Sequence, residues 1–392
     1  MRYKFSNRTN WELNENNISQ IFKQLKLEQV DVLDLTVSNP TKLNFLYPKE
    51  KILKALNSSE NLLYFPDSKG LLLARKEVVG YYAQKGIILD PEQIFLTAST
   101  SEAYSFVFRL LANPKDNVVF PKPSYPLFEF LVGLNDLEMN TYPLIYDNGW
   151  HPDWDILRES FSDKTKAVVV VNPNNPTGSF LEGKDVDCLN EMIKEKNMAI
   201  VCDEVFLDYM FDETQDYLSL AGNCENLTFV LGGLSKALGM PQMKLSWIVV
   251  NGPEDQMREA CSKLEVIADT YLSVNAPSQN ALKQWFECKC EIQKSICDRI
   301  CSNYTYLKDR TEDVSLVECL YAQGGWYAVL KVSSMIKEED IVLNLLEEDH
   351  VFVHPGYFFD FPEETFLIVS LLATRESFRV GLERILKRLA SY

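Results

Sequence analysis

Short runs of consecutive apolar residues recur along the chain, and amphipathic stretches separate them. Six runs stand out: IFLTAS (94–99), NVVFP (117–121), AVVVVN (167–172), MAIVCDE (198–204), LTFVLGG (227–233) and LSWIVVN (245–251). Continuous apolar strands that alternate with helical segments are typical of a parallel or mixed sheet covered by helices on both faces. The pattern therefore predicts an α/β fold with a central, mostly parallel mixed sheet.

Polar residues follow the first five of these runs. They are STS (99–101), PSY (123–125), NPNN (172–175), DE (203–204) and SK (235–236). Ligands of such sheets bind beyond the carboxyl ends of the strands, where loops and helix N-termini gather. We therefore expect a ligand site at this edge of the sheet.

Length and composition narrow the class of protein. A chain of 392 residues, 46% hydrophobic and 24% charged, predicts a folded protein of two domains. The net charge of −17 argues against nucleic acid or an anionic membrane as the main partner, because both require a basic surface. The first 17 residues lack the apolar core of a signal peptide, and no run is apolar enough to span a membrane. These features favour a cytoplasmic location.

The cysteines and histidines of the chain favour neither disulfide bonds nor a metal site. The nine cysteines are scattered, and an odd number in a large chain favours reduced thiols. Only Cys288, Cys290, Cys297 and Cys301 cluster, in a charged helix-like segment without paired CxxC motifs, so thiols are preferred there to a zinc site. Three histidines do not suffice for a histidine-based metal site, and we predict no metal.

Lys236 and Asp203 suggest a specific chemistry when they are considered together. Lys236 lies among small residues in GGLSKALG (232–239), where its amine could form a Schiff base with an aldehyde cofactor; alone it could equally be a surface lysine. Asp203 ends an apolar strand, where a pyridinium N–H would be a suitable partner for its carboxylate. The alternative for Asp203 is a cap of the following turn.

Three further segments could surround such a cofactor. NPNNPTG (172–178) is a turn after a buried strand, from which an Asn side chain could reach a phenolic oxygen. Ser99, Thr100 and Ser101 precede a helical stretch whose N-terminus could hold a phosphate, although helix capping explains one hydroxyl. Tyr125 could stack on the ring or pack in the core.

In this order, the segments resemble the class I/II aminotransferases of pyridoxal-phosphate (PLP) fold type I. The resemblance extends from about residue 34 to 374. It covers YFPDSKGLLLAR (64–75), TASTSEA (97–103), PKPSYP (121–126), NPNNPTG, DEVF (203–206), LSKALG (234–239), AQGGWY (322–327) and HPGYFF (354–359). So many ordered matches are a specific signal.

The resemblance implies a role for each matching residue. Lys236 is the Schiff-base lysine, Asp203 pairs with the ring nitrogen, Asn175 reaches the phenolic oxygen and Tyr125 stacks on the ring. Ser99, Thr100, Ser101, Ser235 and Lys244 lie near the phosphate, and Tyr64 reaches the phosphate of a neighbouring subunit in a homodimer with shared sites. The family also implies a large domain over residues 48–285 and a small domain from residues 1–47 and 286–392.

Four departures from the family pattern are visible. Phe206 stands where a Tyr often donates to the phenolic oxygen, which should raise the pKa of the imine. Lys244 replaces an Arg and loses its two-pronged hydrogen bonding, and Gly233 replaces a Ser. The segment FLIVSLLAT (366–374) lacks the Arg that binds the substrate carboxylate in relatives.

Other groups must then recognise the substrate. Ser38 and Asn39, in DLTVSNPT (34–41), could offer hydrogen bonds, and Arg8, Arg375 and Arg379 are candidate cations, although surface ion pairs are the ordinary fate of each.

The sequence thus predicts a PLP-dependent aminotransferase that moves an amino group between an amino acid or amine and a 2-oxo acid. The alternative is a lyase, decarboxylase or cyclase of the same fold, because fold alone does not separate these reactions. An effector-binding domain of a transcription regulator is disfavoured, because the acidic chain leaves no room for a DNA-binding domain before the pattern begins. A catalytically inactive relative is disfavoured by the presence of both Lys236 and Asp203.

Overall fold

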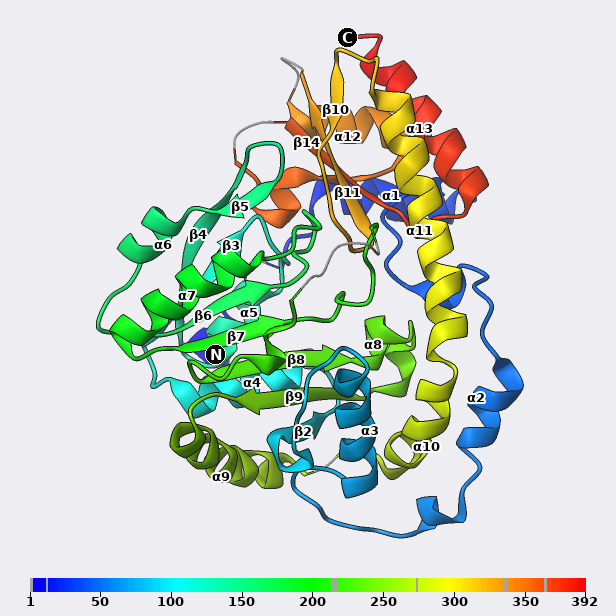
Figure 1. The fold of residues 1–392 in the computed structure, drawn as a ribbon. Helices are drawn as coiled ribbons and strands as arrows, with labels where there is room; N and C mark the ends of the chain where they lie inside the picture. The colour runs from blue at the N-terminus through cyan, green and yellow to red at the C-terminus, as the bar shows by residue number, and fades with distance from the viewer. Residues whose placement is uncertain (1–2, 12, 213–217, 273, 334–336, 363–364) are drawn as a thin grey trace.

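All six apolar runs form strands of one eight-stranded sheet (Figure 1). The computed structural model describes residues 3–11, 13–212, 218–272, 274–333, 337–362 and 365–392. The strands are β2 (Ile94–Thr97), β3 (Asn117–Lys122), β4 (Glu138–Tyr146), β5 (Trp150–Pro152), β6 (Thr165–Val171), β7 (Ala199–Asp203), β8 (Thr228–Gly233) and β9 (Ser246–Asn251), in the order β2-β9-β8-β7-β6-β3-β4-β5. Strands β8, β7, β6, β3 and β4 run parallel, whereas β9 is antiparallel to both of its neighbours and β5 to β4. The predicted mixed, mostly parallel sheet is confirmed.

Helices cover both faces of this sheet because successive strand residues point to opposite sides. Val169 and Val171 of β6 pack with α4 (Thr100–Leu111), α5 (Phe128–Leu134) and α9 (Glu254–Tyr271). Val168 and Val170 face the other core, with α3 (Leu72–Ala83), α7 (Gly183–Lys196) and α10 (Ala276–Glu287). Burying each such side chain contributes roughly 1.5–3 kcal/mol, so both faces of the sheet stabilise the fold.

A second, antiparallel sheet is built from the C-terminal part of the chain. Its strands are β10 (Val317–Cys319), β11 (Tyr327–Val332), β13 (His354–Pro355) and β14 (Thr365–Ser370), in the order β10-β11-β14-β13. The N-terminal β1 (Leu33–Asp34) pairs with β12 (Val351–Phe352). Helices α1 (Asn17–Leu27), α12 (Glu338–Glu347) and α13 (Arg375–Leu389) pack around these strands (Figure 1). Segments from both ends of the chain therefore lie side by side.

The long helix α11 (Lys289–Thr311) extends from the side of the large sheet to the small one (Figure 1). Two short helices, α2 (Lys49–Ala55) and α6 (Trp154–Glu159), complete the larger part, together with α8 (Leu234–Ala237) after β8. The domain boundaries stay a prediction; the proposed boundary after residue 285 falls in the last turn of α10.

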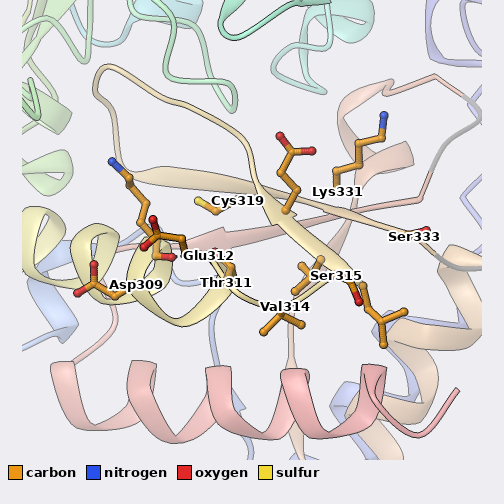
Figure 2. A pocket seen from close by; sticks show the side chains of 12 residues that line it. Asp309, Thr311, Glu312, Val314, Ser315, Cys319, Lys331 and Ser333 are labelled. Atoms are coloured by element: carbon orange, nitrogen blue, oxygen red, sulfur yellow. The ribbon is translucent and has the colours of Figure 1, made fainter.

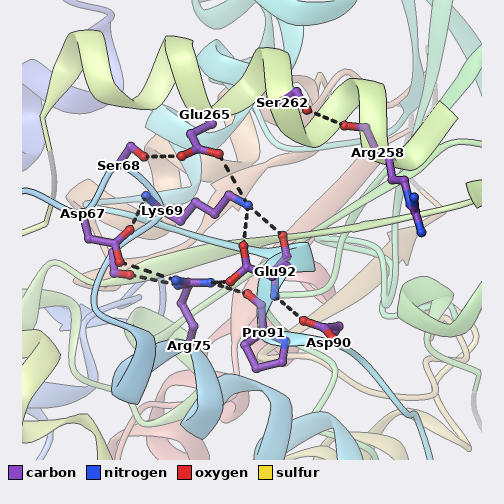
Figure 3. A network of polar contacts seen from close by, with 11 residues as sticks. Asp67, Ser68, Lys69, Arg75, Asp90, Pro91, Glu92, Arg258, Ser262 and Glu265 are labelled. Carbon is purple, nitrogen blue, oxygen red and sulfur yellow. Dashed lines mark hydrogen bonds and ion pairs between the residues drawn. The ribbon is translucent and has the colours of Figure 1, made fainter. Parts of the chain in front are cut away.

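A network of ion pairs around two buried cations fixes the turn before α3 (Figure 3). Arg75, 5% exposed, donates to the carbonyl of Gly70 over 2.9 Å and to the carboxylate of Glu92 over 2.8 Å. Lys69 contacts the same Glu92 at 2.8 Å and Glu265 at 3.5 Å. The side chains of Arg75 and Lys69 are buried, whereas that of Glu92 is 63% exposed, so removing Glu92 would leave buried cations with fewer partners, which is costly. The network therefore stabilises the turn before α3, whose Lys69 carbonyl accepts from the N–H of Leu96 in β2.

Neither a membrane helix nor a metal cluster is seen in the described ranges. No helix there is long and apolar enough to cross a bilayer. Cys288 follows α10, and Cys290, Cys297 and Cys301 lie along α11, but no group of three or more His, Cys, Asp or Glu side chains among the described residues is arranged to hold a metal ion.

Candidate active site

The loops after β6, β7 and β8 meet at the carboxyl edge of the large sheet, because these strands run parallel. The backbone N–H of Asn172, at the end of β6, donates to the carbonyl of Asp203, at the end of β7, over 2.8 Å. Lys236 lies in α8, directly after β8. The fold thus brings three of the predicted segments to one place.

Asp203 is a buried carboxylate with two hydrogen-bond donors. It is 8% exposed, and it accepts from the N–H of Val205 over 3.1 Å and from the hydroxyl of Tyr104 over 3.1 Å. Burial raises the pKa of Asp203 to about 6, and these two bonds together with the charge of Lys236 oppose the rise. A cationic ring N–H at this carboxylate would relieve the cost of its burial.

The amine of Lys236 lies against aromatic faces. Its Nζ is 4.7 Å from the centre of the Trp326 ring and 5.3 Å from that of Phe206. The backbone carbonyl of Lys236 accepts a hydrogen bond of 2.6 Å from the hydroxyl of Tyr209, which fixes the short helix. Burial lowers the pKa of the Lys236 amine to about 8, with Asp203 partly opposing the effect. A larger neutral fraction near pH 8 is what a nucleophilic lysine requires.

The N-terminus of α4 presents hydroxyls beside free backbone N–H groups. Ser99 is the N-cap residue, and its hydroxyl accepts a hydrogen bond of 3.2 Å from the N–H of Glu102. Helix capping, the alternative explanation for one of the three hydroxyls, therefore applies to Ser99. Thr100 and Ser101 begin the helix, where the dipole favours an anion. The three residues form one continuous helix entrance that could hold a phosphate.

The NPNNPTG loop folds back on the AQGGWY segment. The carbonyl of Gly178 accepts from the N–H groups of Gln323 and Gly324, each over 3.0 Å. Gly178 has a φ of +71°, and a Cβ there would lie 2.4 Å from the carbonyl oxygen of Gly324, so only glycine fits. This docking places Trp326 beside Lys236.

Tyr125, Ser38 and Tyr327 gather on a further wall. Tyr125 is 39% exposed and feels the charge of Asp203, and burial raises the pKa of its hydroxyl. Burial raises the pKa of Tyr327 to about 12, with the Ser38 side chain opposing the rise and Tyr125 adding to it. Asn39 caps a short turn, accepting from the hydroxyl of Thr41 over 2.7 Å. Through Tyr327, Ser38 is thus linked to the surroundings of Tyr125, whereas the side chain of Asn39 is used within its own turn.

The remaining cofactor candidates are less constrained. Lys244 is exposed in a left-handed conformation, φ 50°, and Ser235 is partly buried in α8. Tyr64 exposes 74% of its surface. The departure at Gly233 has a steric reason, because a Cβ there would lie 2.3 Å from the hydroxyl oxygen of Ser246.

The candidate substrate-binding arginines are engaged elsewhere. Arg8 forms an ion pair with Asp136, with its Nε 2.6 Å from the carboxylate. Arg375 donates to the carbonyl of Asp298 over 3.1 Å, and Arg379 lies 5.0 Å from the ring of Tyr306. Every other arginine of the described ranges also has a carboxylate, carbonyl or aromatic partner: Arg75, Arg109, Arg158, Arg258, Arg299, Arg310, Arg384 and Arg388.

Comparisons with known proteins agree with this geometry. The family model for aminotransferase class I and II matches residues 30–385. The chain belongs to the class I and II aminotransferases. It is 28% identical over 356 residues to the glutamate-pyruvate aminotransferase AlaA of Haemophilus influenzae, covering 89% of this chain and 88% of that protein. It is 25% identical over 387 residues to the alanine aminotransferase of Mycobacterium tuberculosis, covering 96% and 89%.

Solved structures of aminotransferases share the whole fold. Alanine aminotransferase from Pyrococcus furiosus superposes with a TM-score of 0.91 at 25% identity, covering 99% of this chain and all of the other. An aminotransferase from Escherichia coli gives a TM-score of 0.88 at 25% identity, covering 100% and 99%. The predicted family, fold type I architecture and aminotransferase activity are confirmed, and the lyase alternative gains no support.

Aminotransferases of this class depend on PLP, and the residues of this chain fit that cofactor. In the segments that carry the predicted motifs, four buried polar atoms lack a hydrogen-bond partner within the part of the chain that the structure describes: Ser124 Oγ, Asn174 Nδ2, Asn175 Oδ1 and Trp326 Nε1, the last in the ring that lies 4.7 Å from Lys236 Nζ. Buried polar atoms without partners are costly, so they indicate a polar ligand that would satisfy them. With the buried carboxylate of Asp203 and the α4 N-terminus, they suit an anionic aromatic group.

Tyr104 and Trp326 received no role in the sequence analysis. Both lie in segments that were recognised, but a tyrosine on the apolar face of a helix and a tryptophan beside glycines resemble core residues. A hydroxyl in an otherwise apolar helix face was the available signal for Tyr104, since such a group needs a partner when buried.

A separate groove is lined by residues 308–333, none of which is a predicted cofactor residue. It encloses about 650 Å³ between the end of α11 and strands β10 and β11 (Figure 2). Lys308, Glu312, Glu318 and Lys331 contribute both signs of charge to its lining.

Proposed function

We propose that the strand-end cluster is the active site, in which Lys236 bonds covalently to PLP and Asp203 receives the ring N–H. The observation that supports this most directly is the placement of a partly buried lysine, with a pKa of about 8, in the field of the buried carboxylate of Asp203. Perturbed titratable groups at the ligand edge of an α/β sheet are typical of catalytic residues. Asn175 and Tyr125 are proposed to contact the ring, and Ser99, Thr100, Ser101, Ser235 and Lys244 the phosphate.

Each residue then has a defined task. When bound, PLP supplies an aldehyde for the lysine and a ring that accepts the electrons of a broken C–H bond. The amino group of the donor would replace Nζ of Lys236 at the cofactor, and the freed Nζ would then take the proton from Cα of the donor and give it back when the reaction runs in reverse. Asp203 holds a proton on the ring nitrogen by its negative charge. Trp326 and Phe206 exclude water from one side of the amine.

The named relatives suggest the substrates. They are a glutamate-pyruvate aminotransferase and an alanine aminotransferase, so we propose that alanine or glutamate is the donor and the matching 2-oxo acid the acceptor. Because the described arginines already have partners, we propose that Ser38 and Asn39 contribute neutral hydrogen bonds to the substrate carboxylate. Arg8 and Arg375 would have to leave Asp136 and the Asp298 carbonyl to take part.

The absorption spectrum of the loaded protein tests the substrate proposal. Alanine or glutamate should convert the cofactor to its pyridoxamine form, and the matching 2-oxo acid should reverse the change. Weak neutral contacts to the carboxylate predict a high KM, on the order of millimolar. Conversion by simple amines but by no amino acid would contradict the proposed substrates while leaving the cofactor roles intact.

We also propose a homodimer with shared active sites. Large apolar side chains are exposed around the loop that carries Tyr64: Leu62 88%, Leu63 50%, Tyr64 74%, Phe65 56% and Leu73 76%. A contiguous exposed apolar segment of this size favours a protein interface. A second copy is the proposed occupant, because most soluble oligomers are symmetric homo-oligomers and Tyr64 would then reach the phosphate of its partner.

Light scattering after size-exclusion chromatography should give about 90 kDa, twice the chain mass of 45.1 kDa. Leu73→Asp should reduce that mass and weaken cofactor binding, because it buries a charge in the proposed interface. Ile88→Asp is the matched control, since Ile88 is 94% exposed and lies beyond the end of α3, away from the Tyr64 loop. A wild-type mass of about 45 kDa would exclude the dimer.

A further inference from the structure

A buried tyrosine of α4 brings to the end of β7 a hydroxyl that packing alone does not require. Tyr104 is 2% exposed, and its ring contacts Phe108 at 5.6 Å and Phe128 at 5.4 Å between centres. A phenylalanine would fill the same space without burying a polar atom, so the hydroxyl needs a partner to offset its desolvation. That partner is Asp203, whose Oδ2 accepts from it over 3.1 Å.

We propose that Tyr104 is a positioning residue of the cofactor site, which holds the carboxylate of Asp203 turned toward the ring nitrogen of PLP. The inference rests on the proposed role of Asp203. A carboxylate offers about four lone-pair positions. The N–H of Val205 uses one on Oδ1 and Tyr104 uses one on Oδ2, so each oxygen is fixed while acceptor capacity remains for the ring.

The tyrosine is suited to this task because its own hydroxyl stays protonated. Burial, with the nearby charge of Asp203 as the second cause, raises the pKa of Tyr104 far above its usual value. It therefore acts only as a donor, and a donor stabilises the ionised form of Asp203. The other ionisable groups that influence Asp203 or its surroundings are Lys236 of α8, Tyr125 of the β3 loop and the neighbouring Cys202.

The consequence is a pH-dependent affinity for the cofactor. The bonds from Val205 and Tyr104 both lower the pKa of Asp203, which burial raises to about 6. Without the hydroxyl the carboxyl group would keep its proton to higher pH. A neutral carboxyl group cannot pair with the cationic ring, so binding would weaken in mildly acidic solution and change little in basic solution.

The experiment measures the dissociation constant of pyridoxamine 5′-phosphate, which binds without a covalent bond, to the full-length protein between pH 5.5 and 8.5. Tyr104→Phe should weaken binding about five- to ten-fold at pH 5.5 and less than about two-fold at pH 8.5. Tyr142→Phe is the matched control, because this buried hydroxyl donates to the Val169 carbonyl over 3.2 Å. It should show no such dependence on pH.

Asp203→Asn separates this inference from the proposed function. In that background Tyr104→Phe should have no further pH-dependent effect, because an amide does not titrate. If Asp203→Asn alone left the affinity for pyridoxamine 5′-phosphate unchanged, the proposed role of Asp203 at the cofactor would be wrong. If Asp203→Asn weakened binding but Tyr104→Phe matched Tyr142→Phe, only the role of Tyr104 would be overturned.

A second variant keeps the test open if Tyr104→Phe does not fold. A fluorinated tyrosine at position 104 is a stronger hydrogen-bond donor, so it should shift the pH dependence of the dissociation constant to lower pH. An unshifted pH dependence would overturn the proposal.

Discussion

Lys236→Ala should reduce turnover by at least about four orders of magnitude, because the same amine is proposed to bond to the cofactor and to move the proton at Cα. After borohydride reduction, the wild-type peptide that contains Lys236 should be heavier by the mass of the cofactor. No peptide of the variant should show this added mass. The absorption band produced by the bond should be lost as well. Non-covalent contacts from Asp203 and the α4 N-terminus should still retain cofactor.

Lys289→Ala provides a matched control for this result. Burial also lowers the pKa of the Lys289 amine, which donates to the side chain of Gln84 over 2.7 Å at the start of α11. A lowered pKa therefore does not distinguish the two lysines. They differ in location, because Lys236 follows β8 near Asp203 and Lys289 begins α11. If the cofactor mass stayed on the protein in Lys236→Ala, or left it in Lys289→Ala, the assignment of Lys236 would be wrong.

The central strands could be predicted because their burial leaves a direct trace in the sequence. The run AVVVV (167–171) is apolar at every position because β6 is covered on both faces. Strands β4 and β5 left no such trace. They lie at the edge of the sheet, where β4 is only partly buried and β5 has three residues, so neither produces a continuous apolar run.

The candidate site was predictable where a motif is local and not where a contact spans the chain. Ser99 is followed by a helix, and its capping function can be read within four residues. Tyr104 and Asp203 are 99 residues apart, and their bond depends on how α4 packs against β8 and β9 of the sheet. The partners of Arg8 and Arg375 are likewise tertiary, which is why sequence order alone left them as candidates.

Asp203→Asn should lower turnover at least about a thousandfold with the fold intact, because it removes the charge that is proposed to keep the ring nitrogen protonated. Stability should behave differently from activity. The pKa of Asp203 is raised from 3.8 to about 6 in the folded protein, so its ionised form destabilises the cofactor-free fold. This penalty is absent below pH 4, grows between pH 4 and 6, and is complete above pH 6 at about 3 kcal/mol.

The variant without cofactor should therefore be at least as stable as wild type at pH 8 and should lose any advantage at pH 4. Denaturant unfolding at both pH values measures this. Glu204→Gln separates the two effects, since Glu204 is also buried, has a pKa raised to about 7 and is bonded by the Ser219 hydroxyl over 2.6 Å. It should show the same kind of pH-dependent stability while keeping turnover. If both variants lost activity equally, burial of charge at the end of β7 would explain the effect, and Asp203 would have no separate role at the cofactor.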